Sequence, residues 1–262
     1  MSNKNLVLTL AGSDPSAGAG LQADLRVMHS LGCYGMGIVT ALTAQSTEGV
    51  SQVWPLSREQ VEAQGDKLLS DITPSAVKVG MLADADVAAG VLALLQRYPL
   101  RNIVVDTILL SSSGKALYDS ANYAGLLAVM RCATVVTPNL PEAQRLLDTD
   151  ITDAGLLARN LSELCDGVSV LLTGGHGASG SAVIDTLYDS DSGSVTFITH
   201  PRCVTPNTHG TGCVLSSALA CYLAQGQPLA IAAQMASVFV SEALRQGASF
   251  TLGHGCGPAF FG

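Results

Sequence analysis

The stretch Asn207-Thr208-His209-Gly210-Thr211-Gly212-Cys213 leads directly into the apolar segment 214–224, which we expect to be a helix. Its two glycines free the backbone, so successive N–H groups can point at one anion, and the dipole of the helix adds to their attraction. The motif therefore predicts a site for the negative charge that develops on a phosphoryl group. The same field would lower the pKa of the Cys213 thiol and favour its thiolate. A glycine turn beside a buried cysteine is the alternative interpretation of so short a motif.

The residues around this motif carry no formal charge over a long stretch. From Cys203 to Ser241 there is not one Asp, Glu, Lys or Arg. A membrane-spanning helix needs about 20 consecutive, mostly apolar residues, whereas the glycines of the motif and the turn Gln225–Pro228 divide this stretch. We therefore expect two helices, at 212–224 and 228–246, buried in the core of a protein that does not span a membrane.

Outward from these helices, short apolar runs alternate with segments of helical spacing. The runs that predict strands are 6–11, 37–44, 50–54, 76–79, 102–105, 134–136, 168–172, 182–188 and 194–198. The segments that predict helices are 19–31, 57–70, 84–98, 122–130, 141–147 and 152–165. This alternation is typical of an α/β fold, here a three-layer α/β/α sandwich with a mostly parallel central sheet, in which ligands bind at the C-terminal ends of the strands. No linker or repeat divides the chain, so we expect one domain over residues 1–262.

The composition excludes several classes of protein. Of the 262 residues, 48% are hydrophobic and 13% are charged, which excludes a disordered, collagen-like or coiled-coil chain. The net charge of −8 repels nucleic acid, so we expect no DNA or RNA partner, and an anionic ligand would need backbone amides or a metal ion. The seven cysteines form no CxxC pair and the first residues do not resemble a signal sequence. We therefore expect reduced thiols in a cytoplasmic protein.

The loop Ala11–Gly20 follows the first predicted strand and contains glycines that let a backbone approach a ligand closely. It lacks the Lys-Ser/Thr ending of a P-loop, and its glycine spacing differs from that of the dinucleotide-binding fingerprint. Taken alone, it is either a binding loop or a plain tight turn.

The segment Thr137–Glu142 follows another predicted strand. Asn139 can cap the next helix and Glu142 can complement its dipole, which is the structural interpretation. In the functional interpretation both lie near phosphates and hold Mg²⁺, directly or through water. Asp106 and the loop at Thr173 follow two further strands. The histidines do not share a metal-ligand spacing, so we expect no zinc site.

An ordered set of motifs is the most specific signal in the chain. It comprises Ala11–Ser16, Gly18–Asp24, Thr40–Gln45, Lys78–Leu82, Thr137–Ala143, Asn207–Cys213 and Gly253–Gly255. Together they resemble the hydroxymethylpyrimidine/phosphomethylpyrimidine kinases of thiamine biosynthesis, a branch of the ribokinase-like superfamily, nearly without gaps from Leu6 to Pro258. The resemblance implies a ribokinase-like fold and a homodimer. It also implies an enzyme that uses ATP and Mg²⁺ to phosphorylate 4-amino-5-hydroxymethyl-2-methylpyrimidine, and then its monophosphate to the diphosphate.

The resemblance also implies roles for individual residues. Those that would bind the aminopyrimidine are Gln45, Asp24, Gly12 and Met81. Those that would form the catalytic anion hole are Gly210, Thr211, Gly212 and Cys213. Those that would bind ATP are Asp106, Asn139, Thr173, Thr208 and His209. Glu142 would hold the metal, the amide of Gln45 would donate to and accept from the ring, and Cys213 would act as the base or position the substrate.

Two departures from the family pattern concern lysines that would lie near the phosphates. This chain has Ser112 and Thr173 where relatives often carry Lys. Their absence shifts the stabilisation of charge to Mg²⁺ and to backbone N–H groups. It also motivates one alternative, a catalytically weak pyrimidine-binding protein. The other alternative is a pyridoxal or pyridoxine kinase on the same fold.

Overall fold

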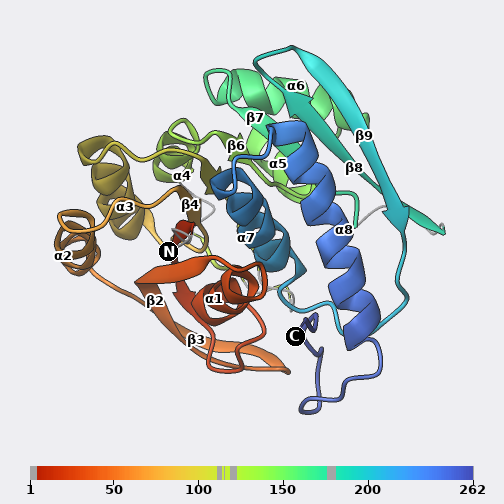
Figure 1. The fold of residues 1–262 in the computed structure, drawn as a ribbon, viewed down its shortest axis with the longest axis horizontal. Coiled ribbons are helices and arrows are strands. Elements are labelled where there is room, and N and C mark those ends of the chain that lie inside the picture. Colours follow the sequence, from red (N-terminus) through yellow and green to blue (C-terminus); the bar gives the residue numbers. More distant parts are fainter. Residues whose placement is uncertain (1–4, 111–113, 115, 119–122, 176–180, 262) are drawn as a thin grey trace.

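The computed structural model describes every residue except 1–4, 111–113, 115, 119–122, 176–180 and 262. Its described strands form one sheet in the order β3-β2-β1-β4-β5-β6-β7-β8-β9 (Figure 1). The strands are β1 (Leu6–Ser13), β2 (Tyr34–Ser46), β3 (Gly49–Pro55), β4 (Ala76–Val79), β5 (Ile103–Val105), β6 (Val135–Val136), β7 (Ser169–Leu172), β8 (Ala182–Asp189) and β9 (Ser194–Pro201). The helices are α1 (Gly20–Ser30), α2 (Arg58–Leu69), α3 (Ala85–Arg97), α4 (Ala124–Met130), α5 (Leu140–Leu147), α6 (Ala154–Leu164), α7 (Thr211–Ala224) and α8 (Leu229–Gly247).

The sheet is mostly parallel, as the alternation of strands and helices predicts. Strands β2, β1, β4, β5, β6 and β7 pair in parallel along the sheet. The antiparallel pairs lie at its two edges, where β3 pairs with β2 and the hairpin β8–β9 continues from β7. The α/β fold with a mostly parallel central sheet is confirmed.

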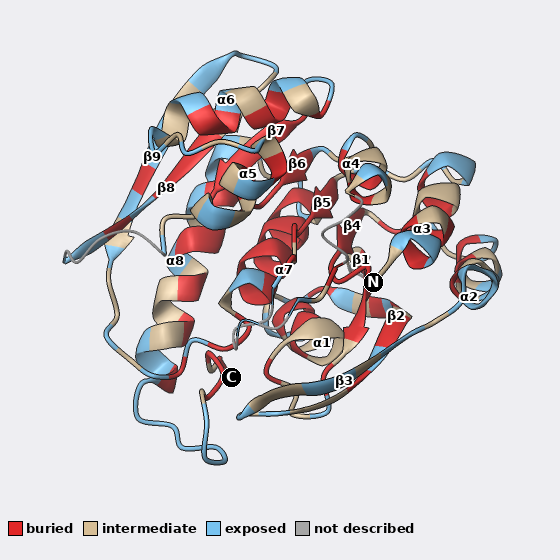
Figure 2. Ribbon diagram, turned by 180° about the vertical axis from the view of Figure 1, so that it is seen from behind, coloured by how far each residue is buried: buried red, intermediate tan, exposed pale blue. Residues whose placement is uncertain are grey.

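Alternate residues of the central strands pack into opposite layers. In β1, Val7 belongs to a core cluster with α1, α7 and α8, whereas Leu8 belongs to a second cluster with α2–α6. In β4, Ala76 and Val77 divide in the same way. Successive side chains of a strand point to opposite faces, and here both faces are covered, so the strands are continuous apolar runs. The central strands are accordingly buried in Figure 2.

Helix α7 is buried along most of its length. Every residue from Cys213 to Leu223 is buried, and α7 packs between α1 and α8 while crossing β1, β4 and β5. A helix with no solvent-facing side has no place for an unpaired charge, which explains why this part of the sequence carries none. Helix α8 is exposed toward its end, where Glu242 and Arg245 form an ion pair. Of the helices described, none combines the length and hydropathy that crossing a membrane requires.

The observed boundaries differ most from the prediction in the second strand. The apolar pattern predicts residues 37–44, whereas β2 runs from Tyr34 to Ser46. Its first half pairs in parallel with β1, and its second half pairs antiparallel with β3. The extra length carries Gln45 beyond the end of β1, where the strand-end loops gather.

Candidate active site

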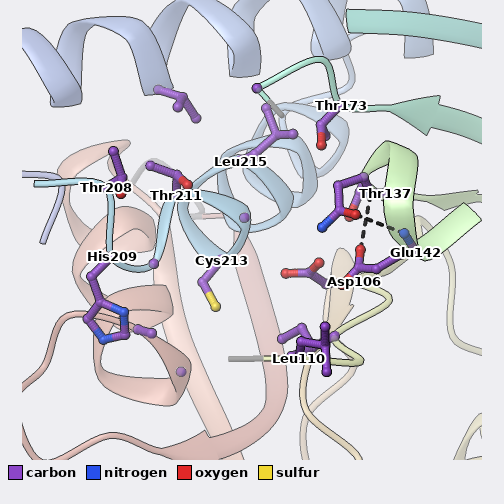
Figure 3. Close-up of a pocket in the computed structure, with 18 of the residues that line it drawn as sticks. Asp106, Leu110, Thr137, Glu142, Thr173, Thr208, His209, Thr211, Cys213 and Leu215 are labelled. Atoms are coloured by element: carbon purple, nitrogen blue, oxygen red, sulfur yellow. Dashed lines mark hydrogen bonds between the residues drawn. The ribbon is translucent and has the colours of Figure 1, made fainter. Parts of the chain in front are cut away.

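A cavity of about 660 Å³ lies at the C-terminal ends of the parallel strands, beside the start of α7. The predicted site residues that line it are Gly12, Gln45, Met81, Asp106, Asn139, Glu142, Thr173, Thr208, His209, Gly210, Thr211, Gly212 and Cys213. In Figure 3, Cys213 lies between His209 on one side and Asp106 on the other, with Glu142 beyond Asp106 and Thr173 above it. The fold therefore brings nearly all of the predicted set to one cavity. Ser112, the first of the two departures from the family pattern, lies outside the described residues.

The start of α7 is built to leave N–H groups available. Gly210 precedes the helix with a φ of +76°, and no side chain caps it. A Cβ on Gly210 would collide with the carbonyl oxygen of Gly18, so only glycine fits this turn. Within the described part of the chain, the N–H groups of Gly212 and Cys213 have no hydrogen-bond partner. Unpaired N–H groups at a helix N-terminus bind anions.

The predicted lowering of the Cys213 pKa is wrong. Burial raises the pKa of this thiol to about 12, and the negative charges of Asp24 and Asp106 add to the rise, whereas Lys78 opposes it. Cys213 is only 6% exposed. The loss of hydration therefore outweighs the field of the helix terminus, and the resting thiol is neutral.

The placement of Asp24 in the substrate pocket is also wrong. Its side chain is fully buried and does not line the cavity. Asp24 accepts hydrogen bonds from Thr9 Oγ1 at 2.6 Å and Ser217 Oγ at 2.8 Å, and it pairs with Lys78 Nζ at 2.8 Å. The helix α1 turns this carboxylate toward the sheet rather than toward the cavity. Sequence reasoning gave Lys78 no role, although a lysine inside a buried strand indicates a buried partner of opposite charge.

His209 lies at the Gln45 end of the cavity. Its Nε2 is 2.9 Å from Asp14 Oδ2 and 3.2 Å from Gln45 Nε2. Thr43 Oγ1 is 3.2 Å from Gln45 Oε1, on the other side of the amide. The predicted contact of His209 with ATP stays a prediction, but one of its neighbours here, Gln45, is a residue predicted for the pyrimidine.

Asp14 orders the loop that precedes α1, a role that sequence reasoning missed. Its carboxylate accepts hydrogen bonds from Ser16 N at 2.8 Å and Ala19 N at 2.9 Å. Burial alone would raise its pKa, but the hydrogen bonds from His209 and Ser16 hold the pKa below its ordinary value. The Ser-Asp-Pro-Ser sequence could have indicated this, because Asp commonly bonds the backbone two residues on.

Asp106 and Glu142 form the acidic end of the cavity. Asn139 and Glu142 make a capping box at the start of α5, as the structural interpretation predicts. Glu142 also accepts from Thr107 Oγ1 at 3.2 Å and Leu109 N at 3.3 Å. Burial, together with the charge of Asp106, raises the pKa of Glu142 to about 7.

Burial likewise raises the pKa of Asp106, so both carboxyl groups are costly to ionise without a counter-charge. Carboxylate oxygens are the ligands that Mg²⁺ prefers, and a divalent cation would supply that charge. These two residues therefore fit a magnesium ion. No group of three or more His, Cys, Asp or Glu suited to a metal occurs in the described ranges, so water or a phosphate would complete the coordination.

A polar chain that sequence reasoning missed holds the loop after β7. Asp185 in β8 accepts a hydrogen bond from Gly174 N at 2.9 Å, next to Thr173. Ser237 of α8 donates to the same carboxylate at 2.7 Å, and His200 Nε2 lies 3.1 Å from it. Asp185, His200 and Ser237 also line the cavity. The hairpin β8–β9 therefore holds in place the loop that carries Thr173 at the cavity wall.

Comparison with known proteins agrees with the motifs. The phosphomethylpyrimidine kinase family model matches residues 14–260. The hydroxymethylpyrimidine/phosphomethylpyrimidine kinase of Escherichia coli (strain K12) is 42% identical over 255 residues, covering 96% of this chain and 95% of that protein.

Two crystal structures resemble the fold closely. Phosphomethylpyrimidine kinase from Clostridium difficile 630 has a TM-score of 0.79 at 32% identity, covering 92% of this chain and 100% of that one. The ADP complex of Bacillus subtilis pyridoxal kinase has a TM-score of 0.88 at 30% identity, covering 98% of this chain and 97% of that one.

Proposed function

The chain belongs to the phosphomethylpyrimidine kinase family, and from that premise we propose that it phosphorylates 4-amino-5-hydroxymethyl-2-methylpyrimidine with ATP. A second transfer converts the resulting monophosphate to the diphosphate. The Escherichia coli relative is named as a kinase of hydroxymethylpyrimidine and of phosphomethylpyrimidine. The observation that carries the proposal is the uncapped start of α7, which lies in one cavity between the Gln45 end and the Asp106 end.

Gln45 recognises the pyrimidine in this proposal. A side-chain amide can donate to a ring nitrogen and accept from an amino group at once. The extended β2 places Gln45 at the cavity wall, with Gly12 and Met81 nearby. A Cβ on Gly12 would lie 3.1 Å from Met81 Sδ, so the small residue keeps room for a flat ring.

The N–H groups of Gly212 and Cys213 receive the transferring phosphoryl group. Donors that are already oriented stabilise developing negative charge without reorganisation. Because the resting thiol is neutral, Cys213 is supported as a residue that holds the hydroxymethyl oxygen, in preference to the base role. Thr211 and Gly210 shape the turn that aims these donors.

ATP is proposed to lie toward Thr173, Asn139 and Thr208, with Glu142 and Asp106 holding Mg²⁺. A magnesium ion held by these two carboxylates would neutralise charge on the phosphate oxygens. Thr173 stands where relatives often carry a lysine, and its hydroxyl can still donate a hydrogen bond. The ADP complex of the Bacillus subtilis neighbour supports nucleotide binding on this fold.

The decisive experiment measures turnover of the pyrimidine alcohol and of its monophosphate, each incubated separately with ATP and Mg²⁺. We expect the mass of each product to increase by one phosphoryl group. Binding of the alcohol without phosphoryl transfer would support the pyrimidine-binding alternative instead.

The pyridoxal kinase alternative has one specific observation behind it, the structural similarity to the Bacillus subtilis enzyme. Pyridoxal and the pyrimidine alcohol should therefore be compared under the same conditions. We expect a higher kcat/KM for the pyrimidine, since the family relatives are named for it. A cytoplasmic homodimer built from a single domain over residues 1–262 stays a prediction.

A further inference from the structure

The motif Gly253–Gly255 has no part in the proposed binding of the pyrimidine, ATP or Mg²⁺. It lies in the loop that follows α8, at the start of a stretch, residues 253–259, that we call the C-terminal segment. Figures 1 and 2 both show this part of the chain beside the turn of the hairpin β2–β3. Strand β2 carries Gln45 to the cavity wall. The C-terminal segment therefore meets the rest of the protein at the Gln45 end of the site.

The C-terminal segment is bonded to Thr47, which lies two residues after Gln45 in the turn between β2 and β3. Gly255 N donates to Thr47 Oγ1 at 3.2 Å, and Cys256 N donates to the carbonyl oxygen of Thr47 at 2.9 Å. A Cβ on Gly255 would lie 2.0 Å from that carbonyl oxygen, so only glycine allows the two backbones to approach so closely. These two hydrogen bonds hold the end of β2 against the C-terminal segment.

The same segment also holds the histidine beside the Gln45 amide. His209 Nε2 lies 3.2 Å from Gln45 Nε2. His209 N donates to the carbonyl oxygen of Gly257 at 3.0 Å, and Ala259 N donates to the carbonyl oxygen of His209 at 3.3 Å. The C-terminal segment therefore contacts both the strand that carries Gln45 and the residue that its amide faces.

Gln45 lies in a part of β2 that the centre of the sheet does not support. The pairing of β2 with β1 ends at Leu42, opposite Ser13. Among the described strands, β2 continues from there paired with β3 alone, and the register of that pairing shifts between Ala44 and Gln45. A two-stranded ribbon is marginally stable by itself. Contacts at the turn of this ribbon therefore decide how firmly Gln45 is held.

We propose that Thr47 is a positioning residue for the pyrimidine. Bonded to the C-terminal segment, it fixes the end of β2, so that the amide of Gln45 is oriented toward the ring before the ligand binds. A side chain that is already ordered loses less conformational entropy on binding. The proposal rests on the proposed function for the identity of the ligand. It assigns the motif Gly253–Gly255 to recognition of the pyrimidine rather than to phosphoryl transfer.

Two variants release this contact. Thr47→Val removes the acceptor of the Gly255 N–H with a similar side-chain shape, and Gly255→Ala places a methyl group against the carbonyl oxygen of Thr47. Calorimetry measures the Kd of 4-amino-5-hydroxymethyl-2-methylpyrimidine and, separately, the Kd of a non-hydrolysable ATP analogue with Mg²⁺. We expect the pyrimidine Kd to rise about three- to tenfold in each variant, comparable to the loss of one hydrogen bond. The Kd of the ATP analogue should stay the same.

Two further variants separate positioning from a general effect on the hairpin. Thr47→Ser keeps the hydroxyl and should bind the pyrimidine like wild type. Ser46→Ala is the matched control, because among the described residues its hydroxyl accepts from Glu48 N within the same turn, at 3.2 Å, rather than from the C-terminal segment. It should also leave the pyrimidine Kd unchanged.

A double variant tests whether Thr47 acts through Gln45. Residues that act as one unit show non-additive effects. In the Gln45→Leu background we therefore expect Thr47→Val to weaken pyrimidine binding no further. If the full effect of Thr47→Val persists in that background, Thr47 does not act through Gln45 and the proposal is wrong.

Wild-type pyrimidine affinity in Thr47→Val, or in folded Gly255→Ala, also overturns the proposal. Equal weakening of the pyrimidine and of the ATP analogue overturns it as well, because general damage to the fold affects both ligands. The proposed function fails separately, if the wild-type protein binds the pyrimidine without phosphorylating it. The binding measurements then still decide the role of Thr47. Absence of pyrimidine binding by the wild-type protein overturns both.

Discussion

His209 Nε2 lies 2.9 Å from Asp14 Oδ2, and this contact joins the loop after the first strand to the loop before α7. A carboxylate only accepts hydrogen bonds, so in this contact Asp14 is the acceptor. The same Asp14 carboxylate accepts from Ser16 and Ala19. One buried acid therefore orders both loops beside Gln45.

Asp14→Asn is expected to destabilise the fold at neutral pH by about 1–3 kcal/mol, because it weakens hydrogen bonds to a charged acceptor. The folded pKa of Asp14 lies below its ordinary value, so its stabilisation is present above the unfolded pKa and is lost as pH falls through the folded pKa. Thermal unfolding across pH should show the difference from wild type shrinking under acid conditions. If the difference in thermal stability between the variant and wild type stays constant with pH, the charge of Asp14 does not contribute to stability.

Gln45→Leu should weaken pyrimidine binding far more than ATP binding. Leucine keeps the approximate size but leaves the polar edge of the ring unpaired, at a cost of about 1–3 kcal/mol. Calorimetry with each ligand measures this. Gln52→Leu is the control, since Gln52 is exposed on β3 and does not line the cavity. Equal pyrimidine affinity in the two variants would remove Gln45 from the binding site.

Gly212→Ala should fold normally and lose phosphoryl transfer. The added methyl group would lie 3.7 Å from Asp106 Oδ2, an ordinary contact, so it projects into the space beside the N–H donors without a clash. Gly210→Ala should instead destabilise the fold, because Gly210 has a positive φ and abuts the backbone of Gly18. Activity and melting temperature of both variants test the pair. Wild-type kcat in Gly212→Ala would exclude phosphate from this helix terminus.

Glu142→Gln should raise the Mg²⁺ concentration needed for half-maximal activity, because an amide is a poorer ligand for this cation than a carboxylate. Glu163→Gln, on the exposed face of α6, should leave that concentration unchanged. If Glu142 acts only in the capping box, activity at limiting Mg²⁺ will equal that of wild type. Stability would then fall slightly, by about 0.3–1 kcal/mol.

Cys213→Ser should retain most of kcat, within about tenfold, whereas Cys213→Ala should lose considerably more. A neutral thiol that holds the hydroxymethyl oxygen can be replaced by a hydroxyl, but not by a methyl group. A general base would give comparable losses of about 10²–10⁴-fold in both variants. Steady-state kinetics of the two proteins therefore distinguish the roles.

Periodicity predicts most of this fold because both faces of its sheet are covered. A run such as Ala76–Val79 is apolar whichever layer each residue faces, and its predicted boundaries match β4. Because ligands of such sheets bind at the C-terminal ends of the strands, the predicted strands then place Asp106, Asn139 and Gln45 at one cavity. Periodicity could not predict whether a polar side chain of a helix or strand points into the cavity or away from it.

Asp24 and Cys213 show the physical reason. Asp24 lies in a motif shared with the family, yet its helix directs it to Lys78 behind the cavity. The pKa of Cys213 depends on hydration and on charges contributed by three other elements. The direction of the Asp24 side chain and the pKa of Cys213 both depend on residues far away in the sequence. A motif before a helix therefore predicts the free N–H groups correctly, but it predicts the wrong direction for the pKa shift of the thiol.

The contact between Asp14 and His209 spans 195 positions of the chain. A third segment joins this contact, since the carbonyl oxygen of Gly257 accepts a hydrogen bond from His209 N at 3.0 Å. The loop beside Gln45 is therefore held by three segments that lie far apart in the sequence, around Asp14, His209 and Gly257. Closing loops of such length costs chain entropy, which the contacts on both sides of His209 must offset. Removing the segment around Gly257 should therefore loosen His209 and, through it, the loop that Asp14 orders, although that loop lies more than 240 positions earlier in the sequence.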